Sequence, residues 1–201
     1  MDSIAEYSIY DIDGTEKCKV VAEENSVYHV ELMKYDYVKL CFKLYEKKSF
    51  GLGDYIYLQS DGGKQKFEIT EIHKPTYDTE TGSYSYELQF NAECYKWGNK
   101  KYKYEPKNDR FEASWALTDT LANHMEVLIR NLAYYGWNFT YNIKDVVNAT
   151  KSIYIQFDNI SILDALTKIA EAFGTEWIVS DNIITLGRVE LGSDIELEQG
   201  V

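Results

Sequence analysis

The chain has 201 residues, a length that suits one large domain or two small ones with a real hydrophobic core. Its 33 acidic and 21 basic residues give a formal net charge of −12, which repels a phosphate backbone and argues against nucleic acid as a partner. Hydrophobic residues make up 45% of the chain, so we exclude a disordered protein. Aromatic residues reach 15%, most of them tyrosines, which favour strands and half-wet contact surfaces.

Membrane, export and disulfide signals are all weak. No apolar run approaches the roughly 18 residues that a membrane span needs, and residues 1–6 lack the basic-then-apolar pattern of a signal peptide. The three cysteines, Cys18, Cys41 and Cys94, are odd in number and widely spaced. We therefore expect ordinary thiols rather than a disulfide framework or a zinc site.

Short alternating segments follow one another through the first half of the chain. The expected strands are residues 4–10, 27–32, 38–44, 54–59, 66–72 and 84–93. In residues 38–44 apolar residues alternate with Lys39 and Lys43. The glycine-containing turn at 60–63 predicts a hairpin between the strands 54–59 and 66–72. Regularly spaced strands with no helical period between them predict a small antiparallel β-barrel or sandwich.

The pattern changes after the polar stretch 97–110, where we place a domain boundary. The expected domains are residues 1–108, the barrel-like one, and residues 109–201, an α+β one. The second begins with apolar residues at spacings of three and four, namely Leu117, Leu121, Met125, Leu128 and Leu132. This stripe predicts a helix over 119–135, with Thr118 as its N-cap and Gly136 at its C-terminal end.

A strand at 137–141 follows, and the theme then repeats. Ser161 is the expected N-cap of a second helix, Asp164 completes an Asp version of the capping box, and Gly174 ends the helix. The strands of this repeat are expected at residues 153–157, 176–179 and 183–186. The second half therefore predicts the order α-β-β-α-β-β, two helices packed on a small sheet, and the whole chain an α+β protein.

No constellation of residues points to catalysis. His29, His73 and His124 lie far apart in the chain, without the clustered donors that a metal site needs. No local pattern resembles an activated cysteine–histidine pair, and the many carboxylates are typical of a solvated acidic surface. We expect a protein that is not an enzyme, with no catalytic residue, no metal and no cofactor.

Aromatic residues crowd the end of the first domain. They are Tyr77, Tyr84, Tyr86, Tyr95, Trp97, Tyr102 and Tyr104. Such side chains anchor protein interfaces, stack on sugar rings, or simply fill strands, and the sequence leaves these three interpretations open. The residues that we expect at an interdomain or intersubunit surface are Tyr95, Trp97, Tyr102 and Tyr104.

Several motifs, taken in order, resemble one family. Residues 50–56 read FGLGDYI ahead of a strand, and the first predicted helix closes on Tyr135-Gly136-Trp137. The most telling segment, residues 160–177, reads ISILDALTKIAEAFGTEW. Over essentially its whole length the chain resembles the N-terminal region of phage and prophage tail-tip proteins, the baseplate-hub and tail-associated-lysin family.

The resemblance implies a structural protein of the virion tail, made in the host cytoplasm. In that family three copies form a ring that closes the tail tube, using β-barrel domains that mimic tube subunits. The implied partners are other tail proteins (distal tail and tape-measure) and the chain itself, as a homotrimer. A second barrel, and any lysin or receptor-binding extension, would lie beyond Val201, as in a chain cut from a longer parent.

A second resemblance supplies the alternative. Residues 152–166 and 183–186 are similar to the short N-terminal domain of secretins and TonB-dependent receptors, which binds periplasmic protein partners. Those proteins carry a signal peptide and usually place this domain first. Here the motif follows a β-rich domain, so we rank this interpretation second.

Overall fold

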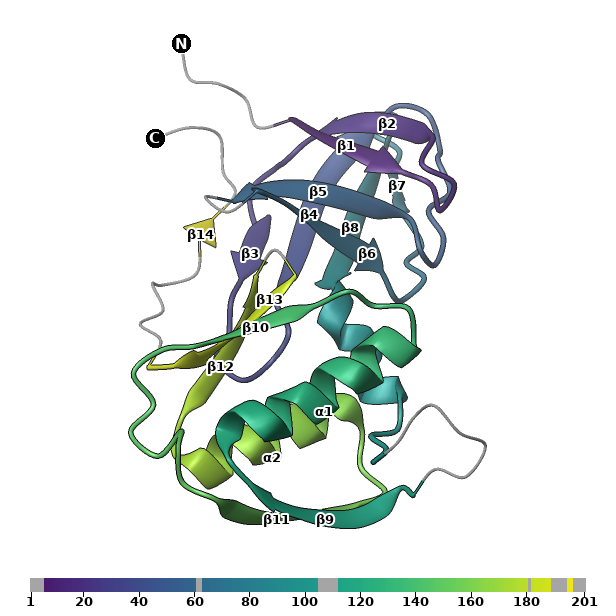
Figure 1. The fold of residues 1–201 in the computed structure, drawn as a ribbon. Helices are drawn as coiled ribbons and strands as arrows, with labels where there is room; N and C mark the ends of the chain where they lie inside the picture. The colour runs from purple at the N-terminus through teal and green to yellow at the C-terminus, as the bar shows by residue number, and fades with distance from the viewer. Residues whose placement is uncertain (1–5, 61–62, 105–111, 181, 189–194, 197–201) are drawn as a thin grey trace. The chain divides into compact units, whose positions relative to one another are not determined.

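The computed structural model describes residues 6–60, 63–104, 112–180, 182–188 and 195–196 (Figure 1). The chain divides into two compact units. Unit 1 comprises residues 1–31, 36–93 and 192–201, and unit 2 comprises residues 32–35 and 94–191. This division follows Glu93, whereas composition placed the domain boundary after residue 108. That the two units are separate folding domains stays a prediction.

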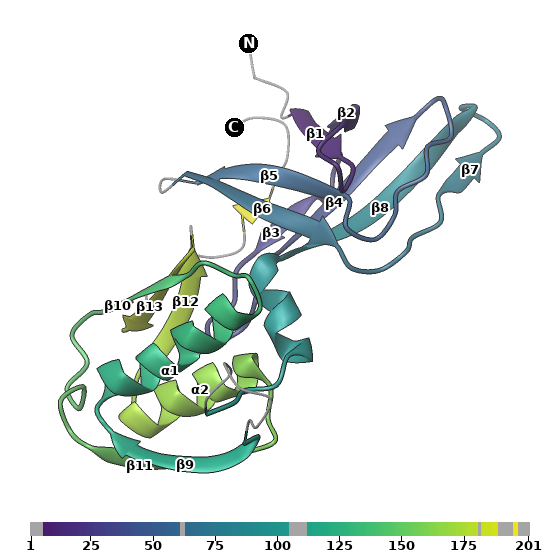
Figure 2. The same cartoon turned by 45° about the vertical axis from the view of Figure 1, so that its right-hand side comes forward.

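Unit 1 is built around one antiparallel sheet. Its strands are β1 (Glu6–Tyr10), β2 (Glu16–Val21), β3 (Val27–His29), β4 (Tyr37–Leu44), β5 (Tyr55–Ser60), β6 (Gly63–Ile69), β7 (Thr76–Asp78), β8 (Ser83–Ala92) and β14 (Ile195–Glu196). The order is β14-β3-β4-β8-β6-β5-β1-β2, with β7 paired to β8. The sheet curls into a half-barrel (Figure 1, Figure 2), and no pairing within the described residues joins β2 to β14.

The alternation predicted for β4 is confirmed. Val38, Leu40 and Phe42 are buried, whereas Lys39 and Lys43 lie on the opposite face. Because side chains alternate along a strand, this pattern alone orients β4 in the sheet. The predicted hairpin is confirmed as well, since β5 and β6 pair antiparallel along their length.

Three strands of unit 1, β2, β7 and β14, were not expected, and β3 is shorter than predicted. The expected strand 27–32 ends at His29, because residues 32–35 belong to unit 2. There Met33 has a left-handed backbone, with φ of 60°, and its N–H donates to the carbonyl of Trp177 at 3.2 Å. A local hydrophobic pattern cannot show that the chain leaves one unit for a few residues and returns.

Unit 2 consists of three layers. The elements that form it are η1 (Glu93–Asn99), β9 (Ser114–Asp119), α1 (Leu121–Tyr134), β10 (Thr140–Ile143), β11 (Ile153–Asp158), α2 (Ile162–Phe173), β12 (Glu176–Ser180) and β13 (Ile183–Gly187). The two helices lie between a three-stranded sheet, β10-β13-β12, and a two-stranded ribbon of β9 and β11 (Figure 2). The order from α1 to β13 is the predicted one, but the strands divide over two sheets rather than one.

The start of the first helix was predicted wrongly. Leu117 and Thr118 belong to strand β9, and α1 begins at Leu121 with Thr120 as N-cap. Leu117 continued the helical spacing by coincidence, and its pairing with Ile155 of β11 decides its structure. The first strand after α1 is also shorter than expected, beginning at Thr140.

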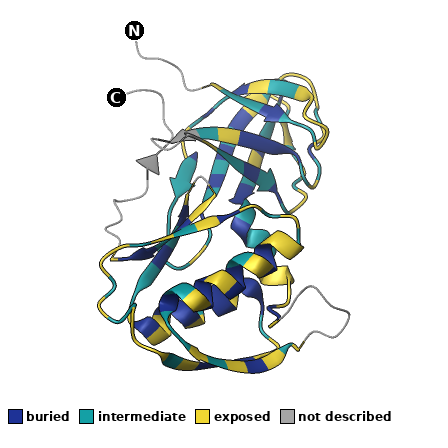
Figure 3. Cartoon of the chain, in the orientation of Figure 1, coloured by how far each residue is buried: buried dark blue, intermediate teal, exposed yellow. Residues whose placement is uncertain are grey.

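The second helix agrees with its prediction in detail. The hydroxyl of Ser161 accepts from the N–H of Asp164 at 3.0 Å, and the Asp164 carboxylate accepts from the Ser161 N–H in return. Gly174 ends the helix with φ of 66°, in the left-handed region. In Figure 3 buried and exposed residues alternate along both helices, as expected of helices that bury one stripe.

Candidate protein-interaction surfaces

The four aromatic residues expected at an interface lie on one segment of unit 2, residues 95–104, which begins within η1. Trp97 and Tyr102 have no exposed surface, Tyr95 is half-buried, and Tyr104 is 41% exposed. The Tyr95 ring meets Tyr35 edge to face, at 4.9 Å between centroids. Of these side chains, Tyr104 offers the largest exposed area to another molecule.

Trp97 and Tyr102 fill the core of unit 2. The Trp97 ring packs edge to face against Phe139 at 4.8 Å, and the Tyr102 ring lies 4.9 Å from Phe157 and 5.2 Å from Trp115. Burial raises the pKa of Tyr102 far above its usual range, so its hydroxyl stays protonated. Their role at an interface stays a prediction; within this chain both rings pack against other aromatic side chains of unit 2.

A buried asparagine that the sequence analysis missed anchors this segment to α1. The Asn131 side-chain oxygen accepts from the Lys103 N–H at 2.9 Å, and its amide nitrogen donates to the Lys103 carbonyl at 2.8 Å. The amide therefore satisfies both backbone groups of one residue in an otherwise apolar setting. A signal was available, since Asn131 follows the stripe residue Leu128 by three positions and so falls on the same, buried side of the helix.

Tyr104 lines a groove of about 320 Å³, called here the Tyr104 groove. Its walls come from β9 and α1. The lining residues are Tyr104, Leu117, Asp119, Asn123, Glu126, Val127 and Arg130. The sequence analysis missed this groove, because it assigned Leu117 and Asp119 to the helix rather than to a strand beside it.

The charges along the Tyr104 groove are unevenly satisfied. Asp119 accepts from the Asn123 amide at 2.6 Å and from the Thr120 N–H at 2.8 Å, and these bonds, the first above all, lower its pKa. Glu126 accepts from the Tyr141 hydroxyl at 2.9 Å. The Arg130 guanidinium, by contrast, has no hydrogen bond or ion pair with any residue that the structure describes. Among the described residues, Arg130 is thus a charged donor of this groove that makes no hydrogen bond or ion pair.

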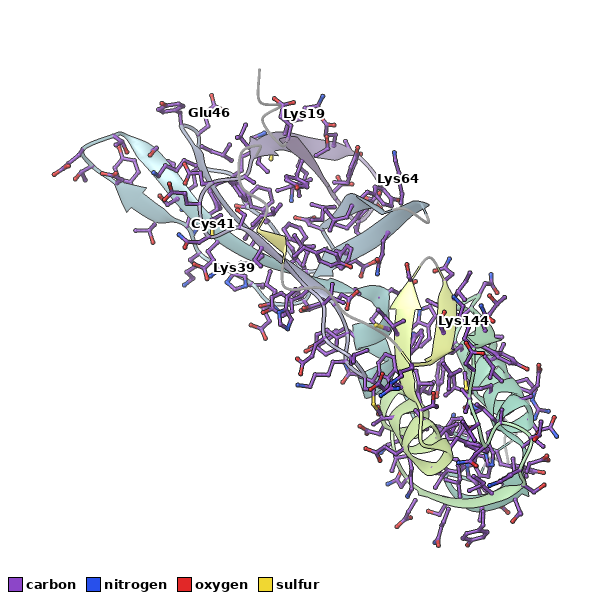
Figure 4. The ribbon with its side chains drawn as sticks, turned by 90° about the vertical axis from the view of Figure 1, so that its left-hand side faces the viewer. Lys19, Lys39, Cys41, Glu46, Lys64 and Lys144 are labelled. Atoms are coloured by element: carbon purple, nitrogen blue, oxygen red, sulfur yellow. The ribbon has the colours of Figure 1, made fainter. Side chains whose placement is uncertain are left out.

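A second groove, of about 480 Å³, lies in unit 1 and brings Cys41 and His73 together. Lys39 and Cys41 share one face of β4 there (Figure 4), and Lys39 pairs with Glu87 at 2.8 Å. Burial raises the pKa of the Cys41 thiol, outweighing the nearby Lys39 ammonium. Among the described residues no hydrogen bond joins the thiol to His73. A protonated thiol without a base is a poor nucleophile.

Two further features of the described residues bear on function. No group of three or more His, Cys, Asp or Glu side chains gathers there in a way that could hold a metal ion. Of the helices in this part of the chain, none combines the length and apolarity that crossing a bilayer requires.

Neither sequence comparison gives a relative. No family model matches the chain, and no curated protein does. Solved structures do match. The 43 kDa tail protein of prophage MuSo2 from Shewanella oneidensis aligns with a TM-score of 0.62 at 10% identity, over 92% of this chain and 54% of that one.

Two further structures agree. Prophage tail protein gp18 from Listeria monocytogenes EGD-e aligns with a TM-score of 0.59 at 10% identity, over 91% of this chain and 50% of that one. The E. coli c3393 protein is a type VI secretion component with structural similarity to the T4 tail proteins gp27 and gp5. It aligns with a TM-score of 0.51 at 10% identity, over 93% of this chain and 46% of that one.

The chain therefore spans about half the length of the structures that it matches. Identities this low carry information about fold and not about activity. At that level the resemblance drawn from the sequence is confirmed: the chain has the fold of phage and prophage tail proteins.

Proposed function

We propose that the chain is a structural component of a phage or prophage tail tip. In this role it closes the end of the tail tube and holds the neighbouring tail proteins, distal tail and tape-measure among them. It would be made in the host cytoplasm and reside in the virion tail. A homotrimer in the complete protein belongs to the same proposal, as does the expectation that the chain catalyses no reaction.

One observation carries the proposal. The matches to prophage tail proteins extend over 91% and 92% of the chain, more than either unit alone could supply. Both units, with the chain passing between them at residues 32–35, therefore take part in the likeness. A small β-domain or a small α/β domain recurs in many proteins, but a match that includes both is far more specific.

The unit 1 sheet fits such a role physically. In the part of the chain that the structure describes, the curled antiparallel sheet ends at β2 and β14 without further pairing, and such edges can pair with further strands or be covered by neighbours. The net charge of −12 keeps the free chain soluble until it assembles. The secretin-like alternative stays a prediction without a structural observation in its favour.

The test is deletion of the coding sequence from the prophage that carries it. We expect induced cells to yield tail tubes without a tip, or heads without tails, by negative-stain electron microscopy. Restoring the full-length gene should restore complete tails, and an epitope tag on it should place gold label at the tip. Normal, infectious particles from the deletion strain would refute the proposal. So would gold label confined to the head.

A further inference from the structure

Within the described residues, strand β9 is paired along one edge only. It pairs with β11 on one side, in antiparallel register, and the Asn159 N–H donates to the Ala113 carbonyl at 2.8 Å. In such a ladder alternate residues turn both backbone groups toward the partner strand. Ala116 and Thr118 therefore turn their N–H and C=O groups away from β11, to a side where no strand of the described chain pairs with them.

The Tyr104 groove runs beside this strand. It extends along α1 from Asn123 to Arg130, a distance of about 10 Å at the helical rise of roughly 1.5 Å per residue. An extended segment of three or four residues covers about the same length. The open edge and the groove together match one short strand, with its backbone on β9 and alternate side chains over α1.

One charge of the groove, that of Arg130, favours an acidic occupant. Asp119 and Glu126 already accept hydrogen bonds from within the chain, whereas Arg130 has no partner among the described residues. A guanidinium is best satisfied by a carboxylate, which it can hold through two parallel bonds. The exposed Tyr104 ring beside it adds an apolar surface.

We propose that the β9 edge and the Tyr104 groove bind an extended segment of a partner protein, which adds a strand to β9 and places a carboxylate against Arg130. The occupant is defined by its extended backbone and this carboxylate, and we take it to be a different protein; pairing with a second copy is an outcome of the test below. This inference goes beyond the tail role and does not depend on it.

Proline substitution tests the edge. Ala116→Pro removes an N–H that β9 does not use within the ribbon, and proline is tolerated on edge strands. Gln156→Pro is the matched control, because Gln156 lies directly opposite Ala116 and turns its own N–H to the outer edge of β11. Arg130→Gln tests the charge without touching the backbone. Thermal melting shows whether each variant is folded.

The probe is a displayed library of random peptides of about twelve residues, long enough for one added strand with flanks. We expect selection on the intact chain to enrich alternating sequences with Asp or Glu at one shared position. Selected peptides should bind Ala116→Pro and Arg130→Gln at least about tenfold more weakly, as expected for losing a charge-assisted bond. Binding to Gln156→Pro should be unchanged.

Hydrogen exchange on the wild-type chain keeps the test decisive even if Ala116→Pro does not fold. A bound peptide should slow exchange of the Ala116 and Thr118 amides and leave Tyr154 and Gln156 unchanged. Protection of the β11 edge instead, or equal weakening by both proline variants, would overturn the proposal. So would enrichment of no peptide, or concentration-dependent protection of β9 without peptide. None of these results bears on the deletion phenotype that tests the tail role.

Discussion

Among the described residues, the buried aspartates and the buried histidine lie in different units. Unit 1 buries carboxyl groups: Asp36 accepts from the Tyr28 hydroxyl at 3.0 Å, and Asp54 pairs with Lys17 at 2.7 Å. Unit 2 buries the imidazole of His124 and the amide of Asn131, both without exposed surface. Removal of a charged group from water costs free energy, and this cost falls on carboxylic acids in unit 1 and on an imidazole base in unit 2.

This difference has opposite electrostatic consequences. Burial disfavours the charged form of any group, so it raises the pKa of a carboxyl and lowers that of an imidazole. The pKa of Asp36 is raised to about 6, above all by burial, and that of His124 is lowered for the same reason. Unit 1 should thus be weakened at neutral pH and unit 2 at acidic pH.

The units can be followed separately. All four tryptophans of the chain, Trp97, Trp115, Trp137 and Trp177, lie in unit 2. Tryptophan fluorescence therefore reports the unfolding of unit 2 alone. Amide hydrogen exchange of peptides from β4 and β8 reports unit 1.

The largest expected effect is Phe157→Ala. Phe157 is fully buried, and its ring contacts Trp115 at 4.5 Å and Tyr102 at 4.9 Å. Truncating a buried phenylalanine costs about 3–5 kcal/mol of unfolding free energy. We expect the fluorescence-detected transition to move to lower temperature while hydrogen exchange of β4 stays unchanged.

The matched control for that variant is Phe42→Ala in unit 1, where Phe42 stacks on Tyr86 at 5.0 Å. It should accelerate exchange in β4 and leave the fluorescence transition in place. If both variants shift the fluorescence transition equally, the units unfold as one cooperative body and the comparison fails.

The next-largest expected loss of stability is that of Asn131→Leu. The leucine fills the space but removes the two hydrogen bonds that the Asn131 amide makes to the Lys103 N–H and C=O. Unsatisfied buried groups cost about 1–3 kcal/mol each, so we expect a loss of roughly 2–4 kcal/mol in fluorescence-detected unfolding. Asn123→Leu on the exposed face of α1 is the control and should change stability far less. Equal losses would show that Asn131 is not the anchor.

Asp36→Asn should stabilise unit 1 at neutral pH. With a folded pKa of about 6 against an ordinary 3.8, the native state holds a proton that the unfolded state has lost. Stability is therefore greatest below about pH 4 and falls as the pH rises toward 6. At 1.36 kcal/mol per pKa unit the asparagine variant should gain about 2–3 kcal/mol at pH 7 and nothing at pH 4. Hydrogen exchange of β4 at both pH values measures this gain, and a variant less stable at pH 7 would contradict it.

His124 should give unit 2 the opposite slope. Its Nε2 lies 3.2 Å from the Ile153 carbonyl and must donate there, while its Nδ1 is buried without a partner in the described chain. Because the folded pKa lies below the ordinary 6.5, the unfolded state takes up a proton first as the pH falls. Fluorescence-detected stability should be full above pH 6.5 and decline below it.

His124→Gln removes the titrating group while keeping a donor for the Ile153 carbonyl. Its stability should decline less on acidification than that of the wild type. Asp119 raises the pKa of His124 slightly and titrates only at much lower pH, so it does not mask the difference. A wild-type unit 2 that becomes more stable between pH 7 and 5 would contradict the assignment.

The sequence predicted most where the determinants were local. The alternation of β4, the capping box at Ser161 and the end of α2 at Gly174 all depend on residues within one turn or one strand. It failed where distant pairing decides, as for Leu117, whose helical spacing lost to its pairing with β11. The Tyr104 groove depends on the same distant pairing, so no local pattern could reveal it. The sequence also could not show that Trp97 and Tyr102 are buried, because composition does not distinguish a packed aromatic residue from an exposed one.

The smallest expected effect compares the two helix starts within unit 2. Ser161 makes a complete capping box, whereas Thr120, the N-cap of α1, makes no side-chain cap bond. Ser161→Ala should therefore cost about 1 kcal/mol in fluorescence-detected unfolding, the usual value of an N-cap, and Thr120→Ala close to nothing. Both variants place alanine at an N-cap, Ser161→Ala by removing a hydroxyl and Thr120→Ala by removing a hydroxyl and a methyl group. Equal effects would mean that α2 gains nothing from its box, and that packing of its stripe against the ribbon and sheet alone sets where the helix begins.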